Sequence, residues 1–124
     1  MRSAEGRAAL DRGAEEARLR GARLIIVHSS KGGGHENAEL IIAIREELER
    51  ISQELTAAGV EHEIRELVRG RTPAEDVVTV AKEAGAELIV IGLRRRSPVG
   101  KLVLGSNAQD ILLQADCAVL AVKP

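Results

Sequence analysis

Apolar residues along the chain form short continuous runs and alternating stretches that predict four β-strands. Wholly apolar runs rich in β-branched residues lie at Leu24–Val27 and Leu88–Ile91. Runs of this kind are typical of parallel strands that are buried on both faces. Apolar and polar residues alternate over residues 60–68, which predicts a strand at an edge of the sheet, and Ala118–Val122 is the last predicted strand.

In the segments between and before these strands, apolar residues recur with the spacing of a helix. This pattern predicts four helices, over residues 4–20, 36–58, 72–84 and 106–115. The third has the clearest start, because Thr72 can cap it, Pro73 suits its first turn and Glu75 completes a capping box. Ser3 and Gly21 are suitable residues for the two ends of the first helix.

Alternation of helices and strands predicts an α/β fold, with an open parallel sheet covered by helices on both faces and a single domain over residues 1–124. The first element, however, is a helix, whereas a doubly wound domain normally begins with a strand in the middle of the sheet. The apolar side of this helix (Ala9, Leu10 and Ala17) needs a sheet to cover. Three alternatives follow: a strand was lost from the N-terminus, the four remaining strands close the gap, or a partner chain supplies the missing edge.

Composition removes several classes of function. The net charge is -1 and the aromatic content is zero, so no ring is available to stack on the bases of single-stranded nucleic acid. No apolar run approaches the ~20 residues of a membrane span, and the start of the chain does not resemble a signal peptide. Cys117 is the only cysteine, which excludes an intrachain disulfide. We therefore expect a cytoplasmic protein that binds neither nucleic acid nor membrane.

Chemistry that can bind an anion gathers between Gly92 and Ser106. Gly92 follows a buried strand, at the edge where open α/β sheets bind ligands. Gly105 and Ser106 begin a helix, whose first turn presents unpaired N–H groups and a partial charge of about +0.5. Four cations lie between these points, at Arg94, Arg95, Arg96 and Lys101. The alternative is a simple turn, a helix cap at Ser106 and a solvated basic loop.

This segment resembles the nucleotide loop of the universal stress protein family, in which a glycine is followed by two residues, a second glycine, nine residues, a third glycine and serine or threonine. Gly92, Gly105 and Ser106 match in register, and Arg95 stands where the second glycine is expected. The segments 21–28 and 116–122 resemble the family's second and last strands. The resemblance implies a Rossmann-like fold of the adenine nucleotide alpha hydrolase-like kind with strand order 3-2-1-4-5, here without the first strand, which would lie in the middle.

The resemblance also implies a stress-response protein that binds ATP or a related nucleotide. The residues expected to bind the nucleotide are Gly92, Leu93, Arg94, Arg95, Gly105, Ser106 and Asn107. Arg95 either contacts phosphate or fills the space that a second glycine would leave open. The family also implies a homodimer that forms through the last strand, Ala118 to Val122. The alternative function is a dimeric interaction or signalling module that binds no nucleotide.

No catalytic constellation and no metal-binding spacing can be identified from the sequence. The loop is not a P-loop, because Leu102 follows Gly100-Lys101 where Ser or Thr is needed. His28 ends a predicted strand and could face a ligand, whereas Cys117 is expected to be buried. A phosphoprotein or weak hydrolase acting through Ser97, Ser106 or Thr72 is a third hypothesis. The sequence therefore favours a binding protein over an enzyme.

Overall fold

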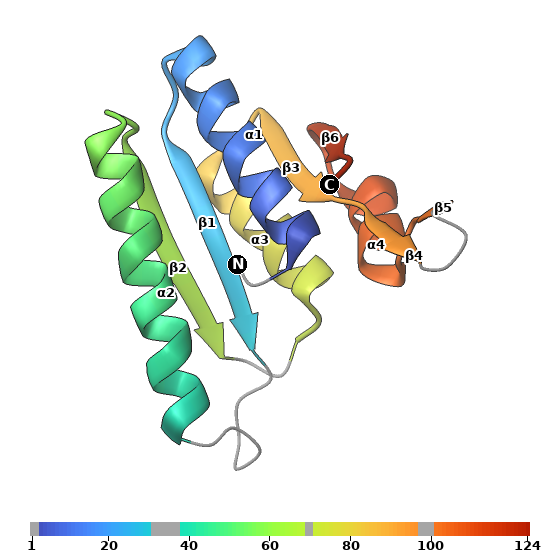
Figure 1. The fold of residues 1–124 in the computed structure, drawn as a ribbon. Coiled ribbons are helices and arrows are strands. Elements are labelled where there is room, and N and C mark those ends of the chain that lie inside the picture. Colours follow the sequence, from blue (N-terminus) through green and yellow to red (C-terminus); the bar gives the residue numbers. More distant parts are fainter. Residues whose placement is uncertain (1–2, 31–37, 69–70, 97–100) are drawn as a thin grey trace.

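Helices and strands alternate along the whole chain (Figure 1). The computed structural model describes residues 3–30, 38–68, 71–96 and 101–124. The elements are α1 (Ala4–Arg20), β1 (Leu24–Ser30), α2 (Ala38–Ala57), β2 (His62–Val68), α3 (Pro73–Ala84), β3 (Leu88–Gly92), β4 (Arg94–Arg96), β5 (Lys101–Val103), α4 (Ser106–Gln114) and β6 (Ala118–Val122). The four predicted helices and four predicted strands are all present. The predicted loops at Gly32–Gly34 and Ser97 lie outside the described residues.

The strands form parallel pairs, as predicted, but not one continuous sheet. β1 pairs with β2 from Leu24↔His62 to Ser30↔Val68, and β3 pairs with β6 from Leu88↔Ala118 to Gly92↔Val122. Over the described residues these are separate two-stranded sheets. The alternative in which the four strands close the gap is therefore wrong, because β1 and β3 are not hydrogen-bonded to each other. Helix α1 instead bridges the two sheets, with contacts to β1, β3 and β6.

The basic segment after β3 is more ordered than the predicted loop. β4 and β5 form an antiparallel hairpin in which Arg94 pairs with Val103 and Arg96 pairs with Lys101. A basic loop was predicted from Gly92 to about Val103, and this was wrong at Arg94–Arg96 and Lys101–Val103, because three consecutive arginines and a three-residue Lys-Leu-Val segment are too short and too uniform to show strand alternation. The hairpin joins the end of β3 to the start of α4 (Figure 1).

Helix ends follow the predicted caps. The Thr72 side chain accepts a hydrogen bond from the Glu75 N–H at 3.2 Å, and Ser3 accepts one from Gly6 at 3.1 Å. Gly85 ends α3 at φ 63°, a left-handed conformation that glycine adopts without a Cβ penalty. These local signals fix where each helix begins and ends.

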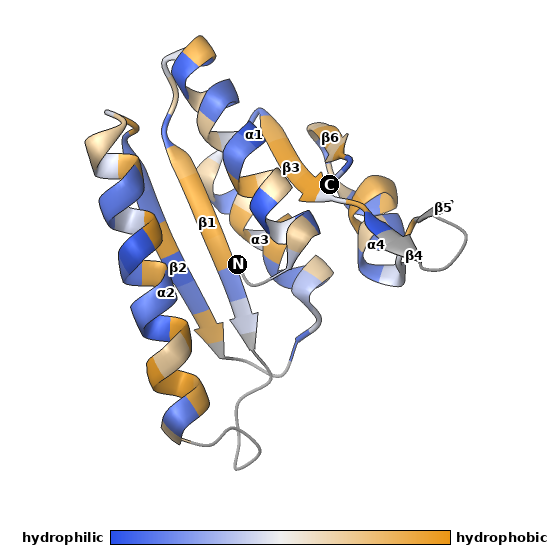
Figure 2. Cartoon of the chain, in the orientation of Figure 1, coloured by the Kyte–Doolittle hydropathy of each residue, from blue (hydrophilic) through white to orange (hydrophobic). Residues whose placement is uncertain are grey.

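Two apolar cores lie on opposite faces of the sheets. The first joins α1, α2 and the β1–β2 pair through Leu10, Ala17, Ile26, Leu48, Ile51, Leu55 and Val60. The second joins α3, α4 and β3 through Ala74, Val78, Ile89 and Ile111. Strands β1 and β3 are apolar along most of their length, whereas α2 alternates polar and apolar residues and begins with an apolar stretch (Figure 2). Successive side chains of a strand point to opposite faces, so each strand contributes to both helix layers.

Candidate functional site

Gly92 ends β3 at the carboxyl edge of its sheet, as the sequence predicted. The Leu93 N–H donates to the Val122 carbonyl at 2.8 Å, which continues the β3–β6 pairing by one more bond. Arg94 and Arg95 follow directly in β4. The hairpin register places Arg94 opposite Val103, shortly before Gly105 and Ser106. The two ends of the predicted nucleotide loop are therefore brought together by backbone pairing.

The start of α4 presents backbone N–H groups to solvent. Gly105 is the N-cap, with extended φ −66° and ψ 165°, and it has no side chain to bond the first turn. Gly105, Ser106 and Asn107 are all exposed, and the first turn of α4 contains no acidic residue. Ser106 is the first residue of the helix and not its cap, so the capping alternative for Ser106 is wrong. This end of α4 has the electrostatic character of an anion site.

The start of helix α1 lies against the tip of β3. A Cβ atom built on Gly92 would lie 2.1 Å from the Glu5 carbonyl oxygen, so only glycine fits this close backbone approach. The Glu5 carboxylate also lies 3.5 Å from the Arg94 Nε atom. Arg94 is 78% exposed, and Glu5 is 27% exposed. One of the predicted phosphate-binding cations therefore has a carboxylate partner, which an incoming anion would have to displace.

A buried carboxylate lies near the carboxyl end of β1. Asp76, on α3, is 1% exposed, and the Ser29 hydroxyl donates to its Oδ2 atom at 2.5 Å. Ser29 thus points toward α3, whereas His28, its neighbour, points to the opposite face of the strand. His28 is half-buried on the side of α1 and α2. A functional role for His28 stays a prediction, and no pattern in the sequence indicated the Ser29–Asp76 pair.

Ser52 and His62 form a second polar pair that sequence analysis missed. The Ser52 Oγ atom lies 2.7 Å from His62 Nε2, and His62 Nδ1 lies 3.0 Å from the Val60 carbonyl oxygen. Ser52 is on α2 and His62 begins β2, and both are half-buried. Their spacing matches no known motif, because the contact depends on how the helix folds back onto the strand.

The remaining candidate residues and segments lie outside the loop 92–106. Cys117 was expected to be buried; it is half-buried and packs against the second core. Over the described residues, His, Cys, Asp and Glu side chains form no group of three or more that could hold a metal ion. None of the described helices has both the length and the apolar character needed to span a membrane.

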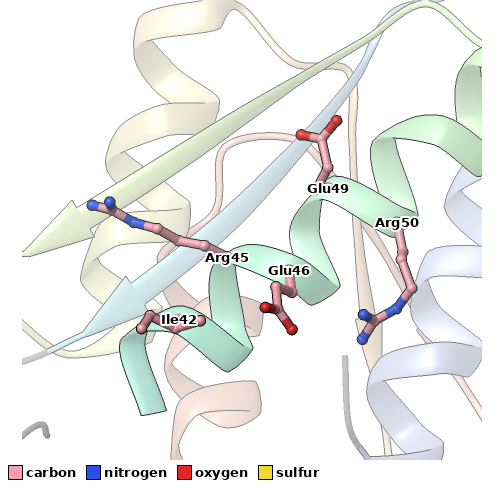
Figure 3. Close-up of a pocket in the computed structure, with 5 residues that line it drawn as sticks. All are labelled: Ile42, Arg45, Glu46, Glu49 and Arg50. Carbon is pink, nitrogen blue, oxygen red and sulfur yellow. The ribbon is translucent and has the colours of Figure 1, made fainter. Parts of the chain in front are cut away.

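A shallow depression lies on the outer side of α2, away from the predicted loop. It is lined by Ile42, Arg45, Glu46, Glu49 and Arg50, and it is open to solvent (Figure 3). The charged groups of these residues point in different directions (Figure 3). Ligand sites normally have polar groups that converge on one point, so this depression by itself does not define a site.

Comparisons with known proteins agree with this arrangement. The model of the universal stress protein family matches residues 2–123. A universal stress protein of Mycolicibacterium smegmatis is 42% identical over 119 residues, which cover 96% of this chain and 89% of that protein.

Solved structures of similar proteins also resemble the fold. A universal stress protein from Archaeoglobus fulgidus superimposes with a TM-score of 0.84 at 43% identity, over 98% of this chain and 92% of that one. Another A. fulgidus structure, in complex with dAMP, has a TM-score of 0.79 at 38% identity, over 98% and 90% of the two chains. A universal stress protein in complex with cAMP has a TM-score of 0.69 at 27% identity, over 93% and 84%.

Proposed function

Because this chain belongs to the universal stress protein family, we propose that it binds an adenine nucleotide by its phosphate groups at the loop 92–106. The phosphate would lie at the start of α4, on the N–H groups and hydroxyl of Gly105, Ser106 and Asn107. Gly92 and Leu93 would border it from the tip of β3. The observation that carries the proposal is the exposed, carboxylate-free first turn of α4, in a chain that is 38% identical to a protein solved with dAMP.

Arg94 adds an exposed positive charge to this site. Guanidinium groups suit phosphate oxygens because they offer paired N–H donors. Arg94 is largely exposed and is held by a single carboxylate at 3.5 Å, so it can turn toward a phosphate at small cost. Arg95 follows Arg94 in the sequence and carries a second positive charge. We infer that ATP binds at this loop, with its outer phosphates near Arg94.

The proposed function is nucleotide-dependent signalling and not turnover. The loop lacks the Lys-Ser or Lys-Thr pair that holds Mg²⁺ and phosphate in P-loop enzymes, because Leu102 follows Lys101. Occupancy would instead fix the hairpin and the start of α4. A cytoplasmic location fits this role and a chain with a single cysteine, Cys117.

Isothermal titration with ATP, ADP, cAMP and dAMP tests the proposal. We expect saturable binding that weakens roughly threefold or more in Arg94→Ala. Arg50→Ala is the matched control, because Arg50 is an exposed arginine on α2 and is not part of the loop. Absence of heat at millimolar concentrations of all four nucleotides would contradict nucleotide binding.

We also propose that the chain forms a homodimer through β6. Over the described residues β6 pairs with β3 alone, which leaves its other edge open. Ala118 and Ala121 are exposed, and none of the five residues of this apolar strand is fully buried. Leu113, near the end of α4, is 84% exposed. An apolar edge strand of this kind needs a cover, and a second copy of the strand supplies one.

Sedimentation equilibrium tests the dimer. We expect a dimer at micromolar concentration that dissociates in Leu113→Asp. Leu19→Asp is the matched control, because Leu19 is 74% exposed but lies on α1. A monomeric wild-type protein at that concentration would contradict the dimer.

The contact of Glu5 with Arg94 and Gly92 favours a second candidate, an interaction module that binds no nucleotide. In this case the start of α1 occupies the β3 tip permanently and the dimer is the functional unit. An intact dimer together with no detectable nucleotide binding would support this candidate over the first.

A further inference from the structure

When the His62 ring is neutral, only one arrangement of protons satisfies the hydrogen bonds of the Ser52–His62 pair. A backbone carbonyl can only accept, so the proton of the neutral His62 ring lies on Nδ1, which donates to the Val60 carbonyl at 3.0 Å. The Nε2 atom then has a free lone pair, and the Ser52 hydroxyl donates to it at 2.7 Å. A serine hydroxyl that donates to an oriented imidazole has the geometry of an activated nucleophile.

Rigid elements hold all three groups. Val60 is 4% exposed, and its N–H donates to the Leu55 carbonyl at 2.9 Å, which closes the end of α2 around Gly59 at φ 73°. His62 is fixed by the β1–β2 register, opposite Leu24. Ser52 lies inside α2, one turn before that end. The carbonyl, ring and hydroxyl are therefore preorganised as a base-orienting group, a base and a nucleophile.

We propose that Ser52 is a nucleophile with His62 as its general base, and that the pair reacts with activated esters of small carboxylic acids. This activity is independent of the nucleotide loop, which lies on other elements. In the first step the Ser52 oxygen attacks the ester carbonyl carbon, Nε2 of His62 takes the hydroxyl proton, and the bond to the leaving oxygen breaks. The product is an acyl-Ser52 ester, and the proton passes from His62 to solvent or to the leaving group.

In the second step, water attacks the acyl-Ser52 carbonyl with His62 again as base. The bond between the carbonyl carbon and the Ser52 oxygen breaks, the carboxylic acid leaves and the Ser52 hydroxyl is restored. No oxidant, metal or further reactant is needed.

The surface beside the pair lies on one flank of α2. Ser52 and His62 are each half-buried, so both residues keep some contact with solvent. Arg45, Glu49 and Ser52 follow the spacing of one helix flank, and the first two line the shallow depression of α2 (Figure 3). Neither Ser52 nor His62 lines that depression, so the expected substrate is a small acyl group on a good leaving group, which needs no enclosing pocket.

p-Nitrophenyl acetate is the probe, and the full chain is the protein tested. We expect p-nitrophenolate release together with one acetyl group on the peptide that contains Ser52, found by mass spectrometry. A general base contributes about a hundredfold or more in rate, so Ser52→Ala and His62→Gln should each lower the release rate at least tenfold.

Two further variants separate a nucleophile from a structural hydrogen bond. Ser52→Cys keeps a nucleophile beside His62 and should remain acylated at residue 52. Thr56→Ala removes an exposed hydroxyl one turn away on the same helix, and its rate should equal that of wild type. Acetylation confined to lysines, or equal rates in wild type and Ser52→Ala, would overturn the proposal. If Ser52→Ala does not fold, a Ser52→Cys variant that folds but is not acylated at residue 52 would overturn it equally.

Discussion

Replacing Gly92 by alanine tests how α1 bridges the two sheets. Gly92 ends β3, and an added methyl group would point at the backbone of α1. It would lie 2.1 Å from the Glu5 carbonyl oxygen, 2.6 Å from the Glu5 carbonyl carbon and 3.0 Å from its Cβ atom. Two of these three obstacles are backbone atoms, so no side-chain rotation can relieve the clash, and the backbone of α1 or of β3 must shift.

The expected cost follows from this forced movement. Inserting one methyl group where no space exists typically destabilises a packed region by about 1–3 kcal/mol. For a chain of 124 residues, the entropy of unfolding converts this into a fall in Tm of about 4–12 °C. The Arg94–Glu5 pair should break as well, because it depends on the same position of α1.

Thermal unfolding followed by circular dichroism measures the effect. Gly105→Ala is the matched control, because nothing lies within 4 Å of an added Cβ there, and only a cap effect of about 1 kcal/mol or less is expected. A Gly92→Ala protein that unfolds at the same temperature as wild type would show that α1 does not lie against β3, and would remove the bridge between the two sheets.

Three further predictions concern the site, the core and pH. Glu5→Gln should raise the affinity for ATP by up to about fivefold, because Arg94 loses the carboxylate that competes with phosphate. Titration calorimetry measures this affinity, and an unchanged value would show that Glu5 does not compete with phosphate for Arg94. Ile111→Ala should lower the free energy of unfolding, measured by urea titration, by about 2–5 kcal/mol, because this 5% exposed side chain fills the second core. A loss below about 1 kcal/mol would contradict that packing. A hydrogen bond from Arg65 lowers the pKa of Glu63 below its ordinary value, so the contact stabilises the fold above that value and is lost as pH falls through the lowered pKa. Urea midpoints of wild type and Glu63→Gln should therefore differ near neutral pH and converge in acid, and a constant difference would refute the assignment.

Much of the fold could be predicted because its signals are local. The apolar runs at Leu24–Val27 and Leu88–Ile91 both became parallel strands, and the cap at Thr72 began α3 where predicted. The separation of β1 from β3 could not be predicted, because it depends on where α1 packs. The hairpin of β4 and β5 was also missed, since a run of arginines carries no strand periodicity.

Some residues of the candidate site could also be predicted from local signals, and others could not. Gly92 at a strand end and Ser106 at a helix start could be placed from sequence, because each belongs to a local motif. The ion pair between Arg94 and Glu5 could not be predicted from sequence. Glu5 lies near the other end of the chain, and only the packing of α1 brings it close to Arg94. The Ser52–His62 pair depends likewise on a helix folding back on a strand. Polar contacts between distant elements leave no periodicity in a sequence.

Amide NMR spectra of isotopically labelled protein during an ATP titration test nucleotide binding at the loop most directly. We predict that the amide signals of Gly92, Gly105, Ser106 and Asn107 shift together and saturate with one dissociation constant, while those of Ile42 and Arg50 on α2 stay in place. Signals at the start of α4 that do not move at millimolar ATP, or shifts confined to other elements, would contradict the assignment of the loop as the nucleotide site.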